Sequence, residues 1–183
     1  MPPEAVLLFE DETIIRLFPN LRRSWSMRGE QATIGITGRN ARRVLFGTIN
    51  ICTGHRIVMC HKNMKQEGFG KFLTHLRRCY RHLPVYLLLD AGGLHTAAKS
   101  QTLAARLHIE LIWLPKQCPE LNGMDQLWRS VKDDISANHQ FSNIDEHTDF
   151  AQAYITKLTN TQALCKAGIL SKNFWLKKYS CKN

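Results

Sequence analysis

The sequence predicts an α/β domain built on a mixed β-sheet. Residues 43–51 and 55–60 are rich in β-branched side chains and flank Thr53-Gly54, a pattern typical of an antiparallel hairpin. Residues 85–89 and 109–114 are short apolar runs separated by a helical stretch, which predicts parallel strands joined by a right-handed crossover. A sheet with both arrangements is mixed, and its faces need helices to cover them.

The N-terminal elements follow from apolar patterning. Residues 6–9 form a short apolar run, predicted to be a strand that ends at Glu10-Asp11-Glu12. The polar segment 22–42 is expected to be loop or short strands. Within residues 63–82, apolar side chains recur at spacings of three and four, which predicts an amphipathic helix that ends before Pro84. These apolar positions are Phe69, Phe72, Leu73, Leu76 and Tyr80.

The remaining elements alternate between buried strands and helices, with neither an internal repeat nor a linker. They are predicted as a buried strand at 85–89, a turn at 90–93, a helix at 95–107, a buried strand at 109–114, a loop at 116–122, a helix at 124–137, and two or three helices up to Tyr179.

Length and charge limit the classes of function that the chain can have. A chain of 183 residues fits one domain, expected to span residues 1–183. Its 25 Lys and Arg against 15 Asp and Glu give a net charge of +10, which favours nucleic acid as partner, although a merely basic protein is the alternative. No apolar run approaches the roughly 20 residues of a membrane span, and the N-terminus lacks secretion features. A cytoplasmic protein without a membrane partner is expected, nucleoid-associated if bacterial.

The six cysteines form no Cys-x-x-Cys pair. This spacing argues against a zinc site or a disulfide framework and favours free thiols in a reducing compartment.

Three aspartates occupy positions where sites gather in α/β proteins. Asp11 is placed at the end of the first strand, Asp90 directly after the buried strand, and Asp125 at the start of a late helix. Each has a structural alternative: Asp90 could cap the next helix, and Asp125 could interact with a helix dipole. Because side chains alternate along a strand, only one of Asp11 and Glu12 can join Asp90.

Converging carboxylates suit hard divalent cations such as Mg²⁺. Two such ions, roughly 3.5 to 4 Å apart, can hold both the attacking and the leaving oxygen of a phosphodiester. A basic chain with three convergent acids therefore indicates phosphoryl transfer on nucleic acid, because the cations bind the polyanion while the acids bind metal.

The segments 87–95 and 113–132 resemble the catalytic core of Tc/mariner-type transposases and their bacterial insertion-sequence relatives. The second contains Trp113-Leu-Pro and Pro119-Glu-Leu-Asn122, and 34 residues separate Asp90 from Asp125, as is typical of that superfamily. Phe9-Glu-Asp11-Glu12 resembles the family's first acidic strand. The resemblance spans about residues 7–135.

The resemblance implies a ribonuclease-H-like mixed sheet flanked by helices, with C-terminal helices. It makes Asp11, Asp90 and Asp125 the catalytic, metal-binding triad for two Mg²⁺ or Mn²⁺ ions in a transposase that cuts and joins double-stranded DNA. The partners it implies are DNA and a second copy or a full-length transposase. The chain departs from the family pattern at Gly123, where Pro is usual, and at Ala91, where Asn is frequent.

Relatives carry helical DNA-binding modules before the catalytic domain. No helix-turn-helix fits in residues 1–10, so this module is expected to be absent. Two alternatives to a transposase therefore stay open. One is a catalytically idle remnant that binds DNA or a full-length partner, and the other is a nuclease of the same fold that cuts without joining.

Several further side chains are candidates near the site. His95 follows Asp90 by five residues and could orient a phosphate or water, or simply begin a helix. Trp128 is expected to pack in the core rather than stack on a base. Candidate contacts to the DNA backbone, each with a solvated charge as the alternative, are Arg42, Arg43, Lys116, Arg129 and Lys132.

Overall fold

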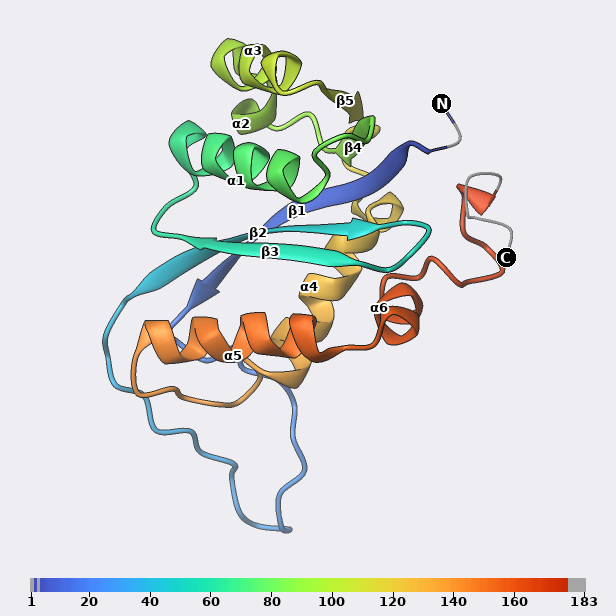
Figure 1. Ribbon diagram of the computed structural model, residues 1–183. Helices are drawn as coiled ribbons and strands as arrows, with labels where there is room; N and C mark the ends of the chain where they lie inside the picture. The colour runs from blue at the N-terminus through green and yellow to red at the C-terminus, as the bar shows by residue number, and fades with distance from the viewer. Residues whose placement is uncertain (1, 3, 178–183) are drawn as a thin grey trace.

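The computed structural model describes residue 2 and residues 4–177, which form a five-stranded mixed sheet with helices on both faces (Figure 1). The strand order is β3-β2-β1-β4-β5. The strands are β1 (Val6–Arg16), β2 (Arg42–Asn50), β3 (Arg56–His61), β4 (Val85–Leu89) and β5 (Ile109–Trp113). The α/β class, the hairpin β2–β3 and the parallel pairing of β4 with β5 confirm the sequence predictions.

The central strand β1 is longer than predicted, and this moves Asp11 from a strand end to the middle of a strand. Residues 6–9 pair in parallel with β4, whereas residues 8–16 pair antiparallel with β2. The three acids interrupt the apolar run, but pairing with β2 supplies the backbone hydrogen bonds that carry the strand on to Arg16. Consequently Asp11 lies in the part of β1 that pairs only with β2, beyond the end of the pairing between β1 and β4.

Two apolar cores lie on the two faces of the sheet because side chains alternate along β1. Val6 and Leu8 face α1 and α3, while Leu7 and Phe9 face α4, α5 and α6. By the same alternation Asp11 faces α4 and Glu12 points to the opposite side, so the two lie on opposite faces as predicted. The helices are α1 (Gln66–Cys79), α2 (Gly93–Thr96), α3 (Ala98–Arg106), α4 (Gly123–Asp134), α5 (Ile144–Lys157) and α6 (Asn160–Lys166).

Two predicted elements need correction. The single helix expected at 95–107 is two helices, α2 and α3, because Ala97 adopts an extended ψ of 135° between them. Strand β5 is not fully buried, since it lies at the sheet edge with Glu110 and Trp113 exposed. Burial on one face is enough to give an edge strand the apolar character of a central one.

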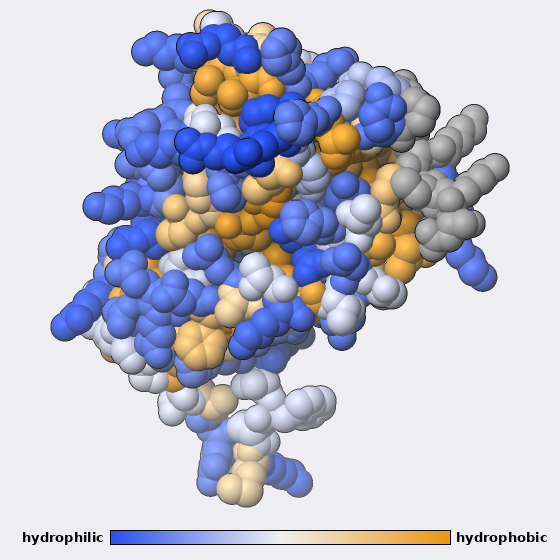
Figure 2. Space-filling view, in the orientation of Figure 1, coloured by the Kyte–Doolittle hydropathy of each residue, from blue (hydrophilic) through white to orange (hydrophobic). Residues whose placement is uncertain are grey.

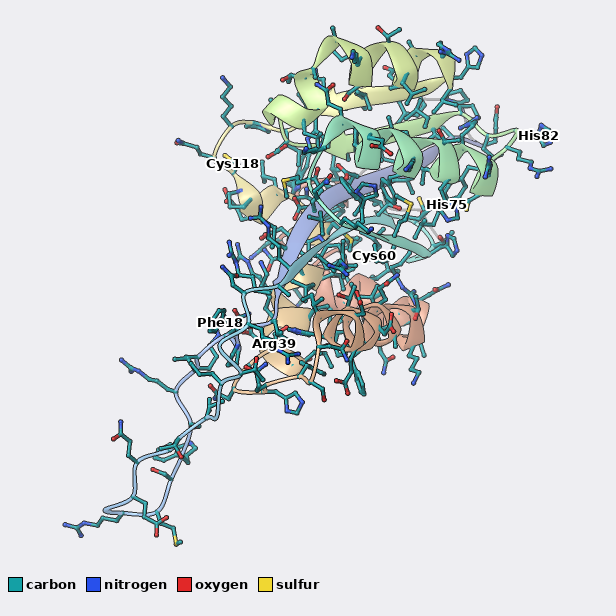
Figure 3. The ribbon with its side chains drawn as sticks, turned by 90° about the vertical axis from the view of Figure 1, so that its left-hand side faces the viewer. Phe18, Arg39, Cys60, His75, His82 and Cys118 are labelled. Atoms are coloured by element: carbon teal, nitrogen blue, oxygen red, sulfur yellow. The ribbon has the colours of Figure 1, made fainter. Side chains whose placement is uncertain are left out.

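The segment between β1 and β2 contains no strand within the part of the chain that the structure describes; its one contact of this kind is a bridge between Asn20 and Ala137. The middle of this segment projects from the body of the molecule, with Phe18 and Arg39 at the base of the projection (Figure 3), whereas Leu17 is buried in the core. The face in Figure 2 is largely hydrophilic, in keeping with the high charge.

The cysteines depart from expectation at one position. Cys60, Cys79, Cys118 and Cys165 are free, but Cys52 is disulfide-bonded. Cys181 lies outside the described residues, as does Tyr179. The spacing of the cysteines along the chain gave no sign of this bond. None of the described helices has the length and apolar character needed to cross a membrane.

Candidate active site

Asp11 enters the site from β1, on the side of the sheet covered by α4. It is half-buried, its partner across the antiparallel ladder is Gly47 of β2, and Phe9, two residues earlier, is part of the core on the same face. This position holds the carboxylate on a rigid central strand just past the end of β4.

Asp90 directly follows β4, so its backbone is fixed by the strand while 66% of its side chain is exposed. Its Oδ1 accepts hydrogen bonds from the Gly92 amide (3.0 Å) and from Nδ1 of His95 (2.8 Å). A Cβ at position 92 would lie 2.9 Å from Asp90 Oδ1, so glycine suits this tight turn. The N-cap of α2 is Gly92, so Asp90 is not the helix cap that the alternative interpretation required.

Asp125 lies in the first turn of α4, and Asn122 sets where that helix begins. The Asn122 side chain is buried; its Oδ1 accepts from the Met124 amide (3.0 Å) and its Nδ2 donates to the Glu10 carbonyl (2.8 Å). The second bond ties the start of α4 to β1 beside Asp11. The Pro119-Glu-Leu-Asn122 motif carried this signal in the sequence, although the role of Asn122 was not predicted.

Gly123 stands where proline is usual in the family, and the space around it is tightly packed by Phe9 and Ala167. A Cβ built on it lies 3.0 Å from a ring carbon of Phe9 and 3.2 Å from the Ala167 carbonyl oxygen. The C-terminal segment also contacts this loop, since Nε1 of Trp175 donates to the Leu121 carbonyl (3.0 Å). The beginning of α4 is therefore held from both sides.

The three aspartates from three separate elements line one cavity of about 190 Å³. Burial, reinforced by the charges of Glu12 and Asp125, raises the pKa of Asp11 to about 8. Burial is the largest cause of this raised pKa, and the neighbouring carboxylates add to it. Since carboxylate oxygens are the ligands of Mg²⁺ and Mn²⁺, the donors fit a divalent cation.

Because folding raises the pKa of Asp11, we expect stability to depend on pH when divalent cations are absent. The native state binds a proton at Asp11 between pH 4 and 8 that the unfolded state releases, so the free energy of unfolding falls as pH rises through this window. Urea titrations in EDTA at pH 5, 7 and 8 measure this fall. Asp11→Asn should make this fall less steep without abolishing it, because the raised pKa values of Glu10 and His95 act in the same direction. An equally steep curve in that variant would contradict the assignment.

On the other face of β1, His95 of α2 lies between acids. Its Nε2 is 2.9 Å from Oε1 of Glu12 and 3.4 Å from Oε2 of Glu10. Burial lowers the pKa of His95, but the hydrogen bond to Glu12 and the charge of Glu10 outweigh it and raise the pKa to about 10. Burial, with the charge of Glu12, raises the pKa of Glu10. Sequence analysis placed His95 near the site but missed both glutamates as its partners.

The predicted DNA contacts divide into paired and unpaired side chains. Nη2 of Arg129 is 2.8 Å from Oδ2 of Asp125, and Nη2 of Arg43 is 2.8 Å from Oδ1 of Asp145 on α5. Trp128 is buried in the core, as predicted. Lys116 and Arg42 are exposed, and among the residues described here they have no carboxylate partner.

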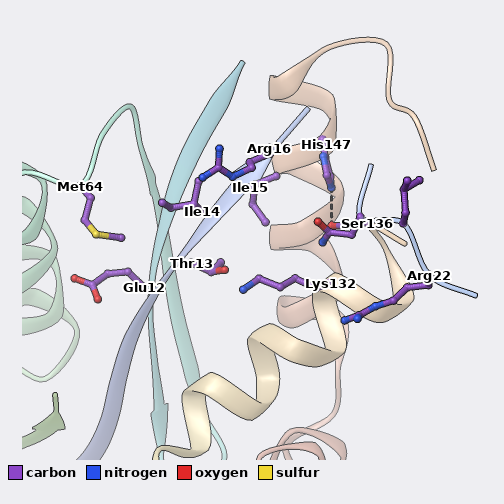
Figure 4. Close-up of a pocket in the computed structure, with 12 residues that line it drawn as sticks. Glu12, Thr13, Ile14, Ile15, Arg16, Arg22, Met64, Lys132, Ser136 and His147 are labelled. Carbon is purple, nitrogen blue, oxygen red and sulfur yellow. Dashed lines mark hydrogen bonds between the residues drawn. The ribbon is translucent and has the colours of Figure 1, made fainter. Parts of the chain in front are cut away.

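Lys132, one of these candidates, lies in a larger pocket of about 540 Å³ between β1 and α4 (Figure 4). Its side chain extends from α4 toward Thr13 of β1, and Arg16 and Arg22 line the same pocket. Arg22 is paired with Asp133 (2.8 Å), whereas Lys132 forms no ion pair within the described part of the chain.

Comparison with known proteins connects this site to a family. The family model described as DDE superfamily endonuclease matches residues 6–148. A curated relative, the Insertion element IS630 uncharacterized 39 kDa protein of Shigella sonnei, is 27% identical over 143 residues, which are 77% of this chain and 42% of that protein. The chain thus spans less than half the length of this relative.

Solved structures show the same fold. The Mos1 transposase paired-end complex with left transposon end has a TM-score of 0.69 at 16% identity, covering 92% of this chain and 53% of that chain. The catalytic domain of Mos1 mariner transposase has a TM-score of 0.62 at 12% identity, covering 88% and 74%. The mixed sheet flanked by helices is thus the predicted ribonuclease-H-like fold. Since the family model matches most of its length, this chain belongs to the DDE superfamily endonucleases.

Proposed function

We propose that this chain is the catalytic domain of a transposase that cleaves double-stranded DNA and joins the cut strand to a target. One observation carries the proposal: Asp11, Asp90 and Asp125, from three separate elements, line one small cavity in a chain of net charge +10. We propose these three as the catalytic, metal-binding residues for two Mg²⁺ or Mn²⁺ ions. The similarity to a Mos1 paired end complex with Mn and to one with Mg supports this cofactor.

The protein's own contribution is to hold carboxylates and the DNA backbone in place. When bound, divalent ions would lower the pKa of a coordinated water molecule and neutralise negative charge on the reacting phosphate. Asp11 and Asp125 are fixed by β1 and by the anchored start of α4, so little reorganisation is needed at the reacting phosphate. Basic side chains would hold the polyanion, among them Lys116, whose neighbours Pro115 and Gln117 line the cavity, and Arg42, which lies farther away at the start of β2.

The function is tested with wild-type protein on supercoiled plasmid and on precut DNA ends with free 3′-hydroxyls. Nicking that requires Mg²⁺ or Mn²⁺, together with joining of precut ends, is the expected result. Nicking without joining would indicate a nuclease, and DNA binding with neither activity would indicate an idle domain. Calorimetric titration with Mn²⁺ counts the bound ions.

Lys132 offers a separate prediction about DNA. It lies seven residues after Asp125 on α4, about 10 Å along the helix axis, within reach of a phosphate near the cut. We expect Lys132→Ala to weaken binding to duplex DNA several-fold. The variant should also release about one counterion fewer on binding, which appears as a smaller slope of log affinity against log salt concentration. Filter binding at several salt concentrations measures both. Lys157→Ala, on the exposed end of α5, is the control; equal effects of the two would contradict a local contact.

We also propose that the domain acts as a pair on DNA, with a second copy or a full-length transposase, at the nucleoid if the source is bacterial. The similarity to a transposase whose solved structure is a paired-end complex supports this. Sedimentation with and without DNA ends tests it, with a species containing two chains expected when ends are present.

A further inference from the structure

The imidazole of His95 lies between Glu12 of β1 and Asp90, which follows β4. Both ring nitrogens of His95 are used: Nδ1 lies 2.8 Å from Oδ1 of Asp90 and 3.1 Å from the Asp90 carbonyl oxygen, and Nε2 lies 2.9 Å from Oε1 of Glu12. The His95 side chain is only 3% exposed, and its ring packs on Phe69 with 4.8 Å between ring centroids. This imidazole is therefore rigid.

Asp90 needs such support more than the other two acids do. It follows the last residue of β4, and its side chain extends into solvent. Among the described residues, only the Gly92 amide and His95 hydrogen-bond its Oδ1, and nothing donates to its Oδ2. The His95 contact thus turns one oxygen inward and leaves the other available.

The contact also joins two parts of the site that the sheet leaves unconnected. The ladder between β1 and β4 ends at the pair Phe9 and Leu88, before either Asp11 or Asp90. Beyond that point, the chain from Glu12 through His95 to Asp90 is a direct side-chain link between β1 and the turn after β4. It therefore fixes the spacing of Asp90 relative to the strand that carries Asp11.

We propose that His95 and Glu12 are positioning residues for Asp90. Glu12 holds the Nε2 side of the ring, so that Nδ1 keeps the Asp90 carboxylate aimed at the cavity shared with Asp11 and Asp125. This inference rests on the proposed function in one respect: it gives the pair a task in metal binding and cleavage. Glu10, whose oxygens are buried without a hydrogen-bond partner, completes the cluster behind the site.

A cation held by Glu10, Glu12 and His95 is the competing explanation, because one ligand atom from each lies within 4.8 Å of the others. The observed distances favour direct hydrogen bonds, since His95 already has a partner at 2.8 or 2.9 Å on each nitrogen. Metal analysis of the purified protein decides between them. Bound Zn²⁺ or Mn²⁺ at one ion per chain, lost in Glu10→Gln and kept in Asp11→Asn, would overturn the positioning role.

The experiment compares Glu12→Ala, Glu12→Gln and His95→Asn with wild type. We expect Glu12→Ala and His95→Asn to weaken Mn²⁺ binding about 10-fold or more and to lower kcat for nicking, with KM for DNA within about twofold, as for other residues that orient metal ligands. Glu12→Gln should retain most of both, because its amide oxygen still accepts from Nε2. Wild-type Mn²⁺ affinity and kcat in His95→Asn would refute the proposal.

Two controls separate positioning from loss of stability and from failure of the proposed function. Phe72→Leu opens a cavity in the core on the face of the sheet where His95 lies. We expect it to lower the free energy of unfolding while leaving Mn²⁺ affinity unchanged. Crystal structures of wild type and Glu12→Ala test the contact without any activity. Asp90 should hold one rotamer in wild type and several in the variant; an unchanged Asp90 would refute the positioning role even if wild type proves inactive.

Discussion

Asp90→Asn should abolish metal-dependent nicking, with a loss of about 10³-fold or more in rate. Asparagine keeps the size of the side chain, and its Oδ1 can still accept from the Gly92 amide, so the turn after β4 should persist. What the variant loses is a negative charge on a side chain that lines the cavity with Asp11 and Asp125. Without that charge the site binds divalent cations weakly, and stabilisation of the reacting phosphate is lost.

The same substitution should leave duplex DNA binding unchanged or stronger, because it removes a negative charge from a surface that faces a polyanion. Plasmid nicking, Mn²⁺ calorimetry and DNA binding on one preparation give the three readouts. Asp149→Asn, an exposed carboxylate on α5 outside the cavity, is the matched control and should nick like wild type. Mg²⁺-dependent nicking by Asp90→Asn at the wild-type rate would remove Asp90 from the catalytic set.

The parts of the fold that depend on local pattern could be predicted from the sequence. Strand β4 has the predicted bounds, and the hairpin strands agree within one or two residues, because apolar β-branched runs bounded by turn residues identify strands directly. The end of β1 could not be predicted. It is fixed by pairing with residues 42–48 of β2, which lie some thirty positions away, and not by its own composition.

The candidate site, too, could be predicted from the sequence only in part. Asp11, Asp90 and Asp125 could be selected from their positions and from the family resemblance, but their shared cavity is a property of the fold. The pairing of Arg129 with Asp125 was predictable, since the two are four residues apart on one helix. The contact between His95 and Glu12, 83 positions apart, was not, because nothing local to either residue indicates the other.

Gly47 is a position where one methyl group should have a large effect. It lies across the ladder from Asp11, and a Cβ there would be 2.5 Å from Cζ2 of Trp128 and 2.6 Å from Cε of Met124. Both side chains belong to α4 and are fully buried, so they have little room to move away. Gly47 is therefore what allows α4 to pack closely against β2, and with it Asp125 to approach Asp11.

We expect Gly47→Ala to lower the free energy of unfolding by about 1–3 kcal/mol and to reduce nicking about 100-fold, because a shift of about 1 Å in α4 misplaces Asp125. Gly35→Ala is the matched control, since a Cβ at that position meets nothing within 4 Å. Adding Trp128→Phe to Gly47→Ala removes the ring atoms that clash and should restore part of the nicking activity. Wild-type stability and nicking in Gly47→Ala would show that α4 can yield without moving Asp125, and the close approach of helix and strand would then not be what sets the geometry of the site.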